Sequence, residues 1–495
     1  MWNSINQALN MIDNFVWGVP LMVLIIAGGL LLTIRLGLLQ IRKLPLALKW
    51  MLQNEEGGKG EISSFSALCT ALSATIGTGN IVGVATAVCA GGPGALFWMV
   101  VAAFLGMATK YSEGLLAVKY RTVAEDGHSL GGPFYYIELG MGKNFKWLAK
   151  IFAFFGVCVG LFGIGTFSQV NGISSAVHGF FDPNDAFTVK ILPFLGEYSW
   201  SVVIASLILS FCVAAVLIGG VKRIASVSQI IVPFMAVIYF VFAVILICCN
   251  ITKVPAAFAT IVTAAFSPKA ITGGAVGSML IAMQKGVARG IFSNEAGLGS
   301  APIAAAAAQT NSPVRQGLVS MTGTFIDTII ICTLTGLSIV LTGAWQVEGL
   351  EGVQVTTYAF QHGLPFPAQF SSFILMLCLV FFAFTTILGW DYYSERCLEY
   401  LSGGNMKHVK IFRWIYILAV FIGPYMTVSA VWTIADIFNG LMAIPNMIAL
   451  FALSGVIVKE TRAFFQHAKE EALAEHRSSE EVCEENLNEE EAPAN

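Results

Sequence analysis

Long stretches of apolar residues, separated by short polar segments, run through most of the chain. About 20 apolar residues are needed for a helix to cross the hydrocarbon core of a bilayer. The pattern therefore predicts an all-α polytopic membrane protein with eleven transmembrane helices. The expected spans lie at residues 13–37, 63–89, 93–118, 148–177, 199–220, 228–250, 273–307, 317–344, 367–395, 410–430 and 432–458.

The composition agrees with this assignment. Of the 495 residues, 56% are hydrophobic and only 12% are charged, whereas a soluble protein averages about 25% charged residues. The cysteines lie mostly in apolar stretches without paired spacing, so we expect small buried side chains rather than disulfides or metal ligands. The expected surroundings are a lipid bilayer, and nothing in the composition points to a nucleic-acid partner.

The basic residues are distributed unevenly between the loops. If residue 1 is outside, 22 of the 27 Lys and Arg residues, Lys110 among them, fall in cytoplasmic loops or the tail, and three fall outside. Lys285 and Arg289 fall within the seventh span. The positive-inside rule then predicts an outside N-terminus and a cytoplasmic C-terminus. We expect a multi-pass protein of the cytoplasmic (inner) membrane of a prokaryote.

The end of the chain has a different composition. Ten glutamates lie between Glu470 and Glu491, and no aromatic residue follows Phe465. Such a segment is expected to be solvated and disordered; a solubilising role is favoured over a regulatory one. The expected division of the chain is an N-terminal segment with the first helix, two five-helix units and an acidic cytoplasmic tail, at residues 1–61, 62–250, 251–462 and 463–495 respectively.

Two segments 214 positions apart share the pattern N-x-x-G-x-[AG]-[ST]-A, at residues 80–87 and 294–301. Each is expected to mark a glycine-rich break at a similar place in an apolar helix. Paired breaks in two halves of a membrane protein point to the substrate site of a transporter. The segments lie five spans apart, and five is odd, so spans 2–6 and 7–11 are expected to be inverted copies with span 1 added. A chance match between small-residue helices is the alternative.

The first break is expected within Ser73-Ala-Thr-Ile-Gly-Thr-Gly-Asn80. Glycine tolerates unusual dihedral angles, so this stretch can leave helical geometry. A new helix start near Gly79 presents free amides and a positive dipole end, which together hold a carboxylate. Carbonyls released upstream can hold a cation. The alternative is a glycine kink that serves only helix packing.

The second break is expected at the turn from Gly290 to Asn294. Its carbonyls are candidates for binding an ammonium group, Phe292 is a candidate wall of the pocket, and Ser293 lies in the same turn. Asn294 either contacts the ligand or ties the break together. Glu295 is expected to pair with Arg289 or with neighbours across the break, because charges within a membrane segment need partners.

Other polar residues interrupt the apolar stretches. Asp327 is a candidate proton or sodium site, with pairing to Arg289 favoured. Gln169 is either a ligand or a bridge between helices. Thr385 and Thr386 are either cation ligands or local hydrogen-bond formers, because threonine readily bonds its own helix.

No other energy source is evident in the sequence. There is no G-x-x-x-x-G-K-[ST] loop for ATP, no His/Cys cluster with metal spacing, and no G-x-S-x-G nucleophile motif. The pattern therefore indicates transport driven by an ion gradient, not an enzyme. A channel would need rings of charge along a continuous pore, and a receptor or scaffold would use the acidic tail as its working part.

Several motifs of the chain together resemble those of one known family. They are Gly91-Gly-Pro-Gly-Ala-Leu-Phe-Trp-Met99, Gly77-Thr-Gly-Asn-Ile-Val-Gly83, Lys110-Tyr-Ser-Glu-Gly114, Gly131-Gly-Pro-Phe-Tyr-Tyr136 and Ala288-Arg-Gly-Ile-Phe-Ser-Asn-Glu-Ala-Gly297. On these motifs the chain is similar to the sodium:alanine/glycine symporters (the alanine-or-glycine:cation symporter family) over about residues 10–460. In the family the motif that begins at Gly91 continues with a second tryptophan, where this chain has Val100.

The resemblance implies a LeuT-like fold, a five-plus-five inverted repeat that carries sodium and a small neutral amino acid, alanine or glycine first. It implies no cofactor other than the co-transported sodium. By this resemblance the substrate is bound by Thr78, Gly79, Asn80, Gln169, Gly290, Phe292, Ser293, Asn294 and Trp390. Sodium is bound at Ser73, Ile76, Thr385 and Thr386. A proton-coupled carrier, with Asp327 or Glu295 as the acid, or a glutamine-preferring carrier of the same fold is the alternative.

Overall fold

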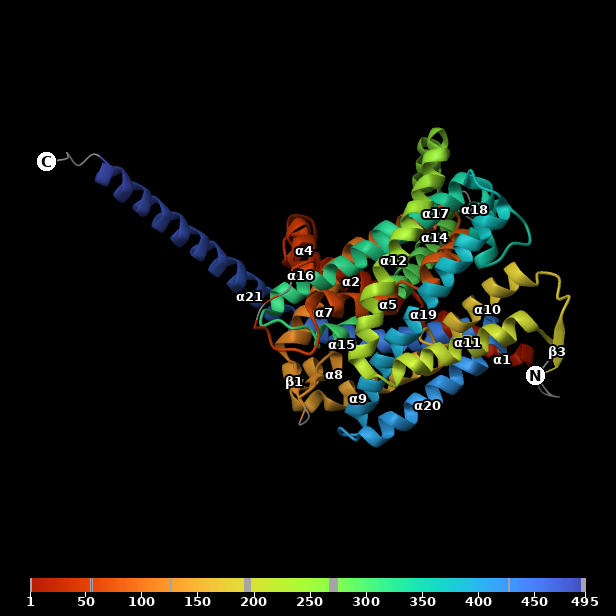
Figure 1. Cartoon of the computed structure of the whole chain (residues 1–495), viewed down its shortest axis with the longest axis horizontal. Helices are drawn as coiled ribbons and strands as arrows, with labels where there is room; N and C mark the ends of the chain where they lie inside the picture. Colours follow the sequence, from red (N-terminus) through yellow and green to blue (C-terminus); the bar gives the residue numbers. More distant parts are fainter. Residues whose placement is uncertain are drawn as a thin grey trace.

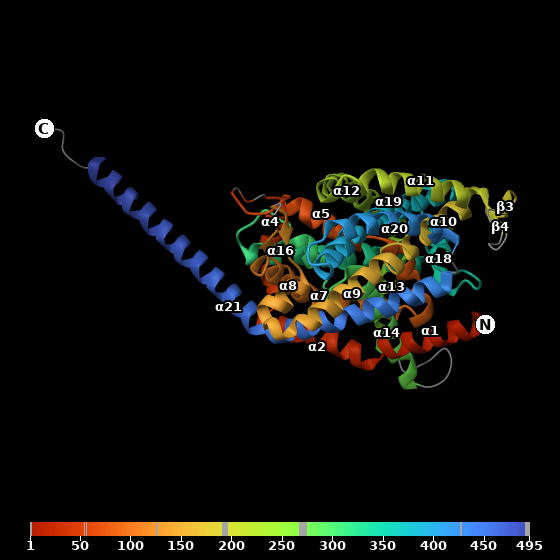
Figure 2. The ribbon, with the colours of Figure 1, turned by 90° about the horizontal axis from the view of Figure 1, so that it is seen from below.

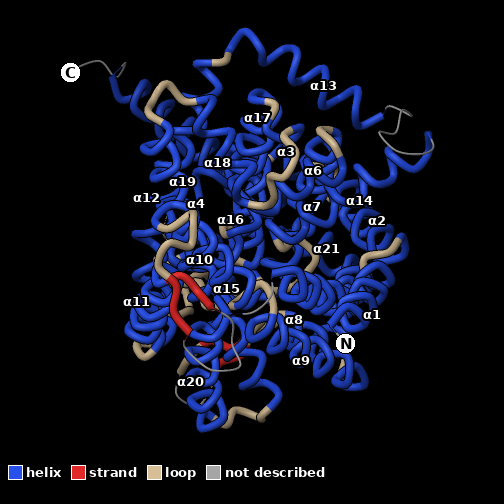
Figure 3. Tube along the Cα trace, turned by 90° about the vertical axis from the view of Figure 1, so that its right-hand side faces the viewer, coloured by secondary structure: helices blue, strands red, loops and turns tan. Residues whose placement is uncertain are grey.

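The computed structural model describes residues 2–53, 55, 57–124, 127–190, 197–266, 275–425 and 428–490. These residues are almost entirely helical (Figures 1 and 3). Two short antiparallel hairpins pair β1 (Thr122–Val123) with β2 (Ser129–Leu130) and β3 (Thr188–Lys190) with β4 (Glu197–Ser199). The helices of the first half are α1 (Trp2–Val16), α2 (Val19–Arg35), α3 (Leu39–Arg42), α4 (Leu44–Met51), α5 (Ser64–Thr75), η1 (Gly79–Gly83), α6 (Val84–Gly91), α7 (Gly94–Lys119), α8 (Pro133–Tyr135), η2 (Tyr136–Met141), η3 (Lys143–Phe145), α9 (Lys146–Phe162), α10 (Phe167–Phe181), α11 (Trp200–Leu217) and α12 (Gly220–Cys249). Those of the second half are η4 (Ile251–Lys253), α13 (Val254–Phe266), α14 (Ala275–Asn294), α15 (Ala301–Ala305), α16 (Pro313–Thr324), η5 (Phe325–Cys332), α17 (Thr333–Thr342), η6 (Ala344–Gln346), α18 (Val353–Gly363), α19 (Ala368–Leu401), α20 (Met406–Ile422), η7 (Gly423–Tyr425) and α21 (Val428–Glu490).

The expected membrane character is confirmed, although the count of eleven is not reached. Among the described residues, eight helices are long and apolar enough to span a bilayer, and the bent pair formed by α5 and the helix after it makes nine. These nine coincide with nine of the expected spans. The other two expected spans correspond to α14 with α15 and to α20. Helix α20 has 17 residues, and α14 carries the polar and charged side chains of Gln284, Lys285 and Arg289.

The two broken spans lie side by side at the centre of the bundle. Helix α14 contacts α6, and α15 contacts α5, so the two pairs run antiparallel. Where the spans meet at one end, the amides of Glu61 and Ile62 both donate to the Ala307 carbonyl, at 2.9 and 3.2 Å. Helix α7 packs along α14 and α16, while α19 packs against α5, α9 and α10. These long helices form the frame that positions both breaks.

The expectation that the repeated segments break their helices at the same place is wrong. In the first span the chain leaves helical geometry before Asn80, and residues 80–87 are helical. In the second, α14 runs unbroken through Gly290 to Asn294, and the break occupies residues 295–300. Three positive φ angles produce it, at Glu295 (58°), Gly297 (92°) and Gly299 (82°). The left-handed region is open to glycine and costly for most other residues.

The acidic tail also differs from expectation. Helix α21 continues from the bundle to Glu490 and projects well away from it (Figures 1 and 2). Disorder was expected from residue 463. Glutamate, alanine, lysine and arginine are strong helix formers, so this composition allows a helix to continue once the preceding span has started it. The expected division into 1–61, 62–250, 251–462 and 463–495 otherwise stays a prediction.

Candidate functional site

The first break lies between the end of α5 and the start of η1, where the chain bends by 51°. Ile76 is extended, with φ −76° and ψ 92°. In a continuous helix the Gly77 amide would bond the Ser73 carbonyl; here it donates to Asn80 Oδ1 at 2.9 Å. This side-chain bond closes the turn and releases the Ser73 carbonyl from its usual helical partner. The break is where the glycine-rich sequence predicts it.

Gln169 reaches the break from α10. Its Oε1 accepts from the Thr78 amide at 3.0 Å, and its Nε2 donates to the Ile164 carbonyl at 3.0 Å. The second bond fixes the orientation of the side-chain amide. A neutral acceptor therefore occupies the Thr78 amide in this structure. Gly172 lies one turn further along α10, and a Cβ added there would approach Thr78 Cγ2 to 2.5 Å.

Helix α14 closes the other side of the first break. A Cβ on Gly79 would lie 3.3 Å from both Phe292 Cδ1 and Ser293 Cα. The expected wall residue and the expected helix start are therefore in contact. Gly290 is not brought to this place: a Cβ there would lie 3.1 Å from Met99 Cγ of α7.

Asp327 joins the two broken spans. One of its carboxylate oxygens accepts from Asn80 Nδ2 at 2.7 Å, and the other accepts from Ser293 Oγ at 2.8 Å and from Thr328 Oγ1 at 2.6 Å. The carboxylate is fully buried. Charge-assisted bonds of this kind are about twice as strong as neutral ones. The Asn80 side chain is thereby engaged on both its oxygen and its nitrogen.

The favoured pairing of Asp327 with Arg289 is wrong, and so is the pairing of Glu295 with Arg289. Arg289 makes a two-pronged bond with Asp436 of α21, at 2.9 and 2.8 Å. Its guanidinium also lies 5.4 Å from the centre of the Phe292 ring. Asp436 was not singled out in the sequence because it lies in an apolar stretch far from both repeated segments.

The expected sodium ligands converge from α5 and α19. Thr386 Oγ1 lies 3.3 Å from the Ile76 carbonyl oxygen, and a Cβ on Gly389 would lie 2.8 Å from Ser73 Oγ. Thr385 points elsewhere: its hydroxyl bonds the carbonyls of its own helix and faces Met235 Sδ at 3.6 Å. Two of the four expected ligands, Ile76 and Thr386, thus meet at the unwound stretch, and Ser73 lies against Gly389 of the helix that carries Thr386.

Trp390 is one turn beyond the threonines and is fully buried. A Cβ on Gly165 would lie 2.7 Å from its Cβ, and its ring meets Tyr393 edge to face at 5.5 Å between centroids. The structure places it on the α9–α10 side of α19. Its role as a wall of the substrate pocket stays a prediction.

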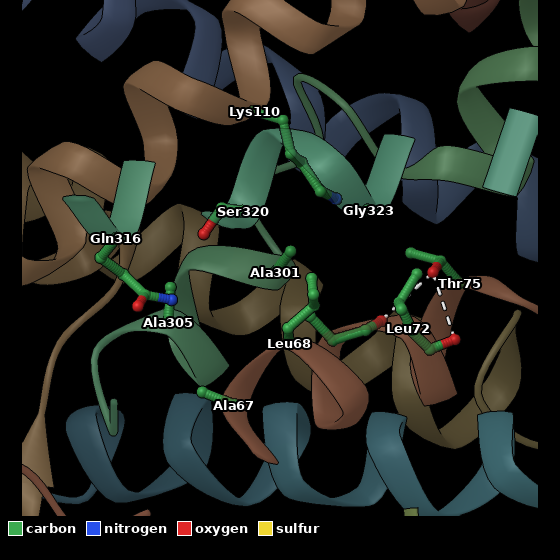
Figure 4. Close-up of a pocket in the computed structure, with 11 residues that line it drawn as sticks. Ala67, Leu68, Leu72, Thr75, Lys110, Ala301, Ala305, Gln316, Ser320 and Gly323 are labelled. Carbon is green, nitrogen blue, oxygen red and sulfur yellow. Dashed lines mark hydrogen bonds between the residues drawn. The ribbon is translucent and has the colours of Figure 1, made fainter. Parts of the chain in front are cut away.

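The first break lies between a wide cleft and a small cavity. The cleft, of about 1160 Å³, is lined by α6, α10, α14, α18 and the start of α19, and it reaches Asn171 and Gly172 beside Thr78. The cavity, of about 10 Å³, lies between α5, α7, α15 and α16. Figure 4 shows Lys110, Gln316, Ser320 and Thr75 around its apolar lining. About 10–15 Å³ is the room that one water needs.

The second break is held by two buried ionisable side chains, those of Lys110 and Glu113. The sequence analysis placed Lys110 in a loop and did not single out Glu113. Lys110 was assigned to a cytoplasmic loop, which is wrong: it lies inside α7, only 2% exposed. Its Nζ donates to the Asn294 carbonyl at 2.8 Å. Glu113, one turn further, accepts from the Gly297 amide at 3.1 Å and from Asn446 Nδ2 at 2.6 Å. The sequence feature that could have revealed both residues is the Lys-Tyr-Ser-Glu motif, because it places two ionisable side chains inside an apolar stretch.

Asn446 and Glu295 complete the support of the second break. Asn446 Nδ2 also donates to the Gly297 carbonyl at 2.9 Å, and its Oδ1 accepts from the Tyr136 hydroxyl. Glu295 accepts from Ser300 Oγ at 2.6 Å across the break. Asn294 ties the same region, bonding the Ala296 amide at 2.9 Å and Thr328 Oγ1 at 3.1 Å. Asn294 is therefore engaged structurally on both its amide atoms.

The sequence matches the profile of the sodium:alanine symporter family over residues 2–478. The chain belongs to the sodium:alanine symporter family. This membership makes it a membrane transporter and agrees with the resemblance carried by its motifs. A transporter of this family also agrees at the coarse level with the expectation that the chain is not an enzyme.

Three relatives align with nearly the whole length of the chain. An uncharacterized transporter of Haemophilus influenzae is 55% identical over 94% of this chain and 97% of its own length. The sodium/alanine symporter AgcS of Methanococcus maripaludis is 46% identical over 94% of this chain and 98% of its own length. A probable sodium/glutamine symporter, GlnT of Bacillus subtilis, is 35% identical over 95% of this chain and 92% of its own length.

Proposed function

We propose that the protein is a sodium-coupled symporter that carries a small neutral amino acid, alanine or glycine first, into the cell by alternating access. One observation carries this proposal: the Thr78 amide, the helix start at Gly79 and the Ile76–Thr386 contact all lie at one break. A carboxylate and a cation can therefore be bound within one turn of each other. The relative at 46% identity that is named a sodium/alanine symporter supports the choice of solute and ion.

The substrate carboxylate binds the amides of Thr78 and Gly79 at the positive end of η1 and α6. To do so it displaces Gln169 Oε1, which holds the Thr78 amide in this structure. Gln169 therefore has one of two roles. Either its side chain turns to bond the substrate, or it holds the Thr78 amide in place only while the site is empty. Phe292 and Ser293 lie directly against Gly79. This close approach leaves room for a small side chain and disfavours a large one.

The substrate ammonium is bound on the α14 side, by carbonyls of the last turn around Phe292 and Ser293. The last carbonyls of a helix lack intrahelical partners and carry the negative end of its dipole. The Asn294 carbonyl is already bonded by Lys110. Asp327 adds a buried negative charge behind Ser293, which favours a cation on that side.

Sodium is bound by the Ser73 and Ile76 carbonyls and the Thr386 hydroxyl, with Thr385 as the weaker fourth ligand. Sodium prefers oxygen ligands, and unwound backbone carbonyls in transporters supply them. Binding there ties α19 to the end of α5 and orders the break before the amino acid arrives. The ion thus increases the affinity for substrate through the shared break, and by linkage the substrate increases the affinity for the ion.

The proposal includes the arrangement in the membrane. Eleven spans form two inverted five-helix units after one additional helix, with the N-terminus outside. The antiparallel contacts of α14 with α6 and of α15 with α5 support the inversion. With this orientation the cleft of about 1160 Å³ opens to the outside and the cavity of about 10 Å³ lies toward the cytoplasm. The structure then represents an outward-facing form.

Uptake into proteoliposomes tests the proposal. Radiolabelled alanine is offered with an inward gradient of sodium, potassium or protons, one at a time. We expect saturable accumulation with the sodium gradient alone. Uptake that is indifferent to all three gradients contradicts symport, and uptake that rises linearly without saturation indicates a channel. Deletion of residues after 463 is expected to leave uptake intact, which separates a transporter from a receptor that works through its tail.

A glutamine carrier is the second candidate, because the 35% identical relative is named a probable sodium/glutamine symporter. A thermal-shift screen of all amino acids, with and without sodium, distinguishes the two. A ligand that binds the folded protein stabilises it by RT ln(1 + [L]/Kd). We expect the largest sodium-dependent shift with alanine or glycine; a larger shift with glutamine favours the second candidate.

A further inference from the structure

Asp391 is a buried carboxyl group with no hydrogen-bond partner. It lies in α19 directly after Trp390 and is 0% exposed. Neither Oδ1 nor Oδ2 is bonded by any donor among the described residues. Most buried polar atoms in proteins have at least one partner, and an ionised carboxylate moved into the interior costs several kcal/mol even after relaxation. Asp391 therefore requires a bound cation or a proton.

Two more carboxyl groups follow Asp391 along the same face of α19. Glu395 and Glu399 are spaced four residues apart, and side chains at this spacing are helical neighbours about 5–6 Å apart at Cβ. Both are only 3% exposed. Asp391, Glu395 and Glu399, called the α19 carboxyl ladder below, lead from the level of Trp390 to the end of the helix.

The cations near the ladder are already committed to its outer members. Arg413 of α20 makes a two-pronged bond with Glu395, at 2.6 and 2.8 Å. Arg396 lies 2.7 Å from Glu399 Oε2, and His128 Nε2 lies 2.8 Å from Glu399 Oε1. Each outer carboxylate thus has its own guanidinium, and Asp391 has none.

The neighbouring helices bring no further charge to Asp391 within the described part of the chain. The ionic groups whose fields reach it are Glu395, Arg413 and Arg396. Tyr416 of α20 also lies near, but its hydroxyl is turned to the carbonyls of Gly165 and Ile387, at 2.9 and 2.8 Å. Helix α9 meets this part of α19 through Gly156 and Gly160, against Cys397 and Ser394, and α5 meets it through Ser73 and Ala74, against Gly389.

The charge count of the ladder decides between an ionised and a neutral Asp391. Three carboxylates face two guanidinium groups, so the fully ionised ladder carries one negative charge more than its two arginines balance. A single proton on Asp391 makes the set neutral. A metal ion is the less suitable occupant, because the described residues contain no group of three or more His, Cys, Asp or Glu side chains that could hold one, whereas a proton needs only one oxygen.

We propose that Asp391 is a proton-binding site of the transporter, loaded and unloaded through the α19 carboxyl ladder from the end where His128 and Glu399 lie. With the orientation proposed above, this end is cytoplasmic. A proton passes from bulk water to Glu399 or His128, then to Glu395 and Asp391, and returns by the same route; no bond other than O–H and N–H is formed or broken. The occupancy of Asp391 then links the transport rate to internal pH.

Infrared spectroscopy of the full chain in lipid nanodiscs tests the site without any substrate. A protonated buried carboxyl group has a C=O stretching band separate from that of carboxylates, and the band shifts in D2O. At neutral pH and without sodium, we expect the wild type to show such a band that Asp391→Asn and Asp391→Ser both lack. Glu460→Gln, which removes a partly exposed carboxylate paired with Lys119 outside the ladder, is the matched control and is expected to keep it. An unchanged band in both Asp391 variants overturns the proposal.

Transport provides the second measurement. Sodium-driven alanine uptake is followed at fixed external pH while the pH inside the vesicles is varied. We expect the wild-type rate to depend on internal pH and the rate of Asp391→Asn to be independent of it. A pH profile that is the same in both overturns the proposal. If alanine uptake fails altogether while the infrared result holds, the assigned substrate is wrong and the proton site stands.

Discussion

At the first helix break the amides of Gly77 and Thr78 bond neutral side chains, those of Asn80 and Gln169. At the second break the Asn294 carbonyl and the Gly297 amide bond ionisable side chains, those of Lys110 and Glu113. Both sets of bonds are buried. They differ in the free energy lost when a partner leaves. A neutral side-chain amide can be replaced by a ligand, whereas a buried charge left without its partner costs several kcal/mol.

This difference assigns separate tasks to two breaks that look alike in sequence. In the proposal, the first break exchanges a neutral partner for the substrate carboxylate: Gln169 is held elsewhere by one bond, to Ile164. Asn80 stays in place through its bonds to Asp327 and Cys332. The second is held by bonds to Lys110, Glu113 and Asn446, and the last turn of α14 before it places Phe292 and Ser293 against Gly79. In the proposed mechanism, the first break binds the substrate and the ion, and the second supports it.

The largest effect is expected from removing the ion that holds the second break. Lys110→Met leaves the Asn294 carbonyl unbonded and removes the cationic group that faces Glu113 and Glu295. Breaking a buried ionic network of this kind destabilises by about 3–5 kcal/mol. We expect a large fall in the thermal unfolding temperature and in the amount of folded protein recovered from membranes.

Lys119→Met is the matched control for this prediction. Lys119 is on the same helix, and its ion pair with Glu460 at 2.9 Å is partly exposed, so the expected loss is about 0–1 kcal/mol. Equal destabilisation by the two variants would show that Lys110 does not have the supporting role described for it.

The next effect concerns the contact between the breaks. Gly79→Val places methyl groups against Phe292 and Ser293, where even a Cβ lies at 3.3 Å. Overpacking costs about 1–3 kcal/mol, which corresponds to about a 5- to 140-fold loss of substrate affinity. Gly83→Val, in the same η1 turn, is the control, because its Cβ would meet only Arg289 Cδ at 4.0 Å. Isothermal calorimetry with alanine and sodium measures both; wild-type affinity in Gly79→Val removes the carboxylate assignment.

A smaller effect distinguishes the two threonines of α19. Thr386→Val removes the hydroxyl next to the Ile76 carbonyl, whereas Thr385→Val removes one that faces Met235. Losing one oxygen ligand is comparable to losing a buried hydrogen bond, about 1–3 kcal/mol. We expect the sodium concentration for half-maximal uptake to rise about tenfold or more in Thr386→Val and clearly less in Thr385→Val. The reverse order would place the ion on the Met235 side.

The sequence predicted the first break well because glycine spacing directly limits helical geometry. Gly77, Gly79 and Asn80 are local, and the Gly77–Asn80 bond closes within one turn. The contact of Thr386 with Ile76 was also expected, but from family resemblance; no local pattern relates residues 310 positions apart. The contact between residues close in sequence was predicted from physical reasoning. The contact between residues far apart in sequence was predicted only from the resemblance to a known family.

The second break lies within the repeated segment 294–301, as expected, but the turn predicted at Gly290 to Asn294 was wrong for a physical reason. Gly290 looks like a helix breaker, but its missing side chain serves the close packing of α14 on Met99 of α7. The actual break depends on Glu295, a non-glycine residue at φ 58°, which is stabilised by its bond to Ser300. Arg289 was paired wrongly because its partner, Asp436, is brought near only by the packing of α21. Tertiary partners of this kind leave no periodic signal in the sequence.

Peptide-resolved amide hydrogen exchange tests the different tasks of the two breaks most directly. The wild type is measured in lipid nanodiscs without ligand, with sodium, and with sodium plus alanine. We expect exchange to slow stepwise at residues 76–83 as each ligand is added, and to stay slow and unchanged at residues 294–300 in all three conditions. Ligand-dependent protection at residues 294–300 that equals or exceeds that at residues 76–83 would contradict the account.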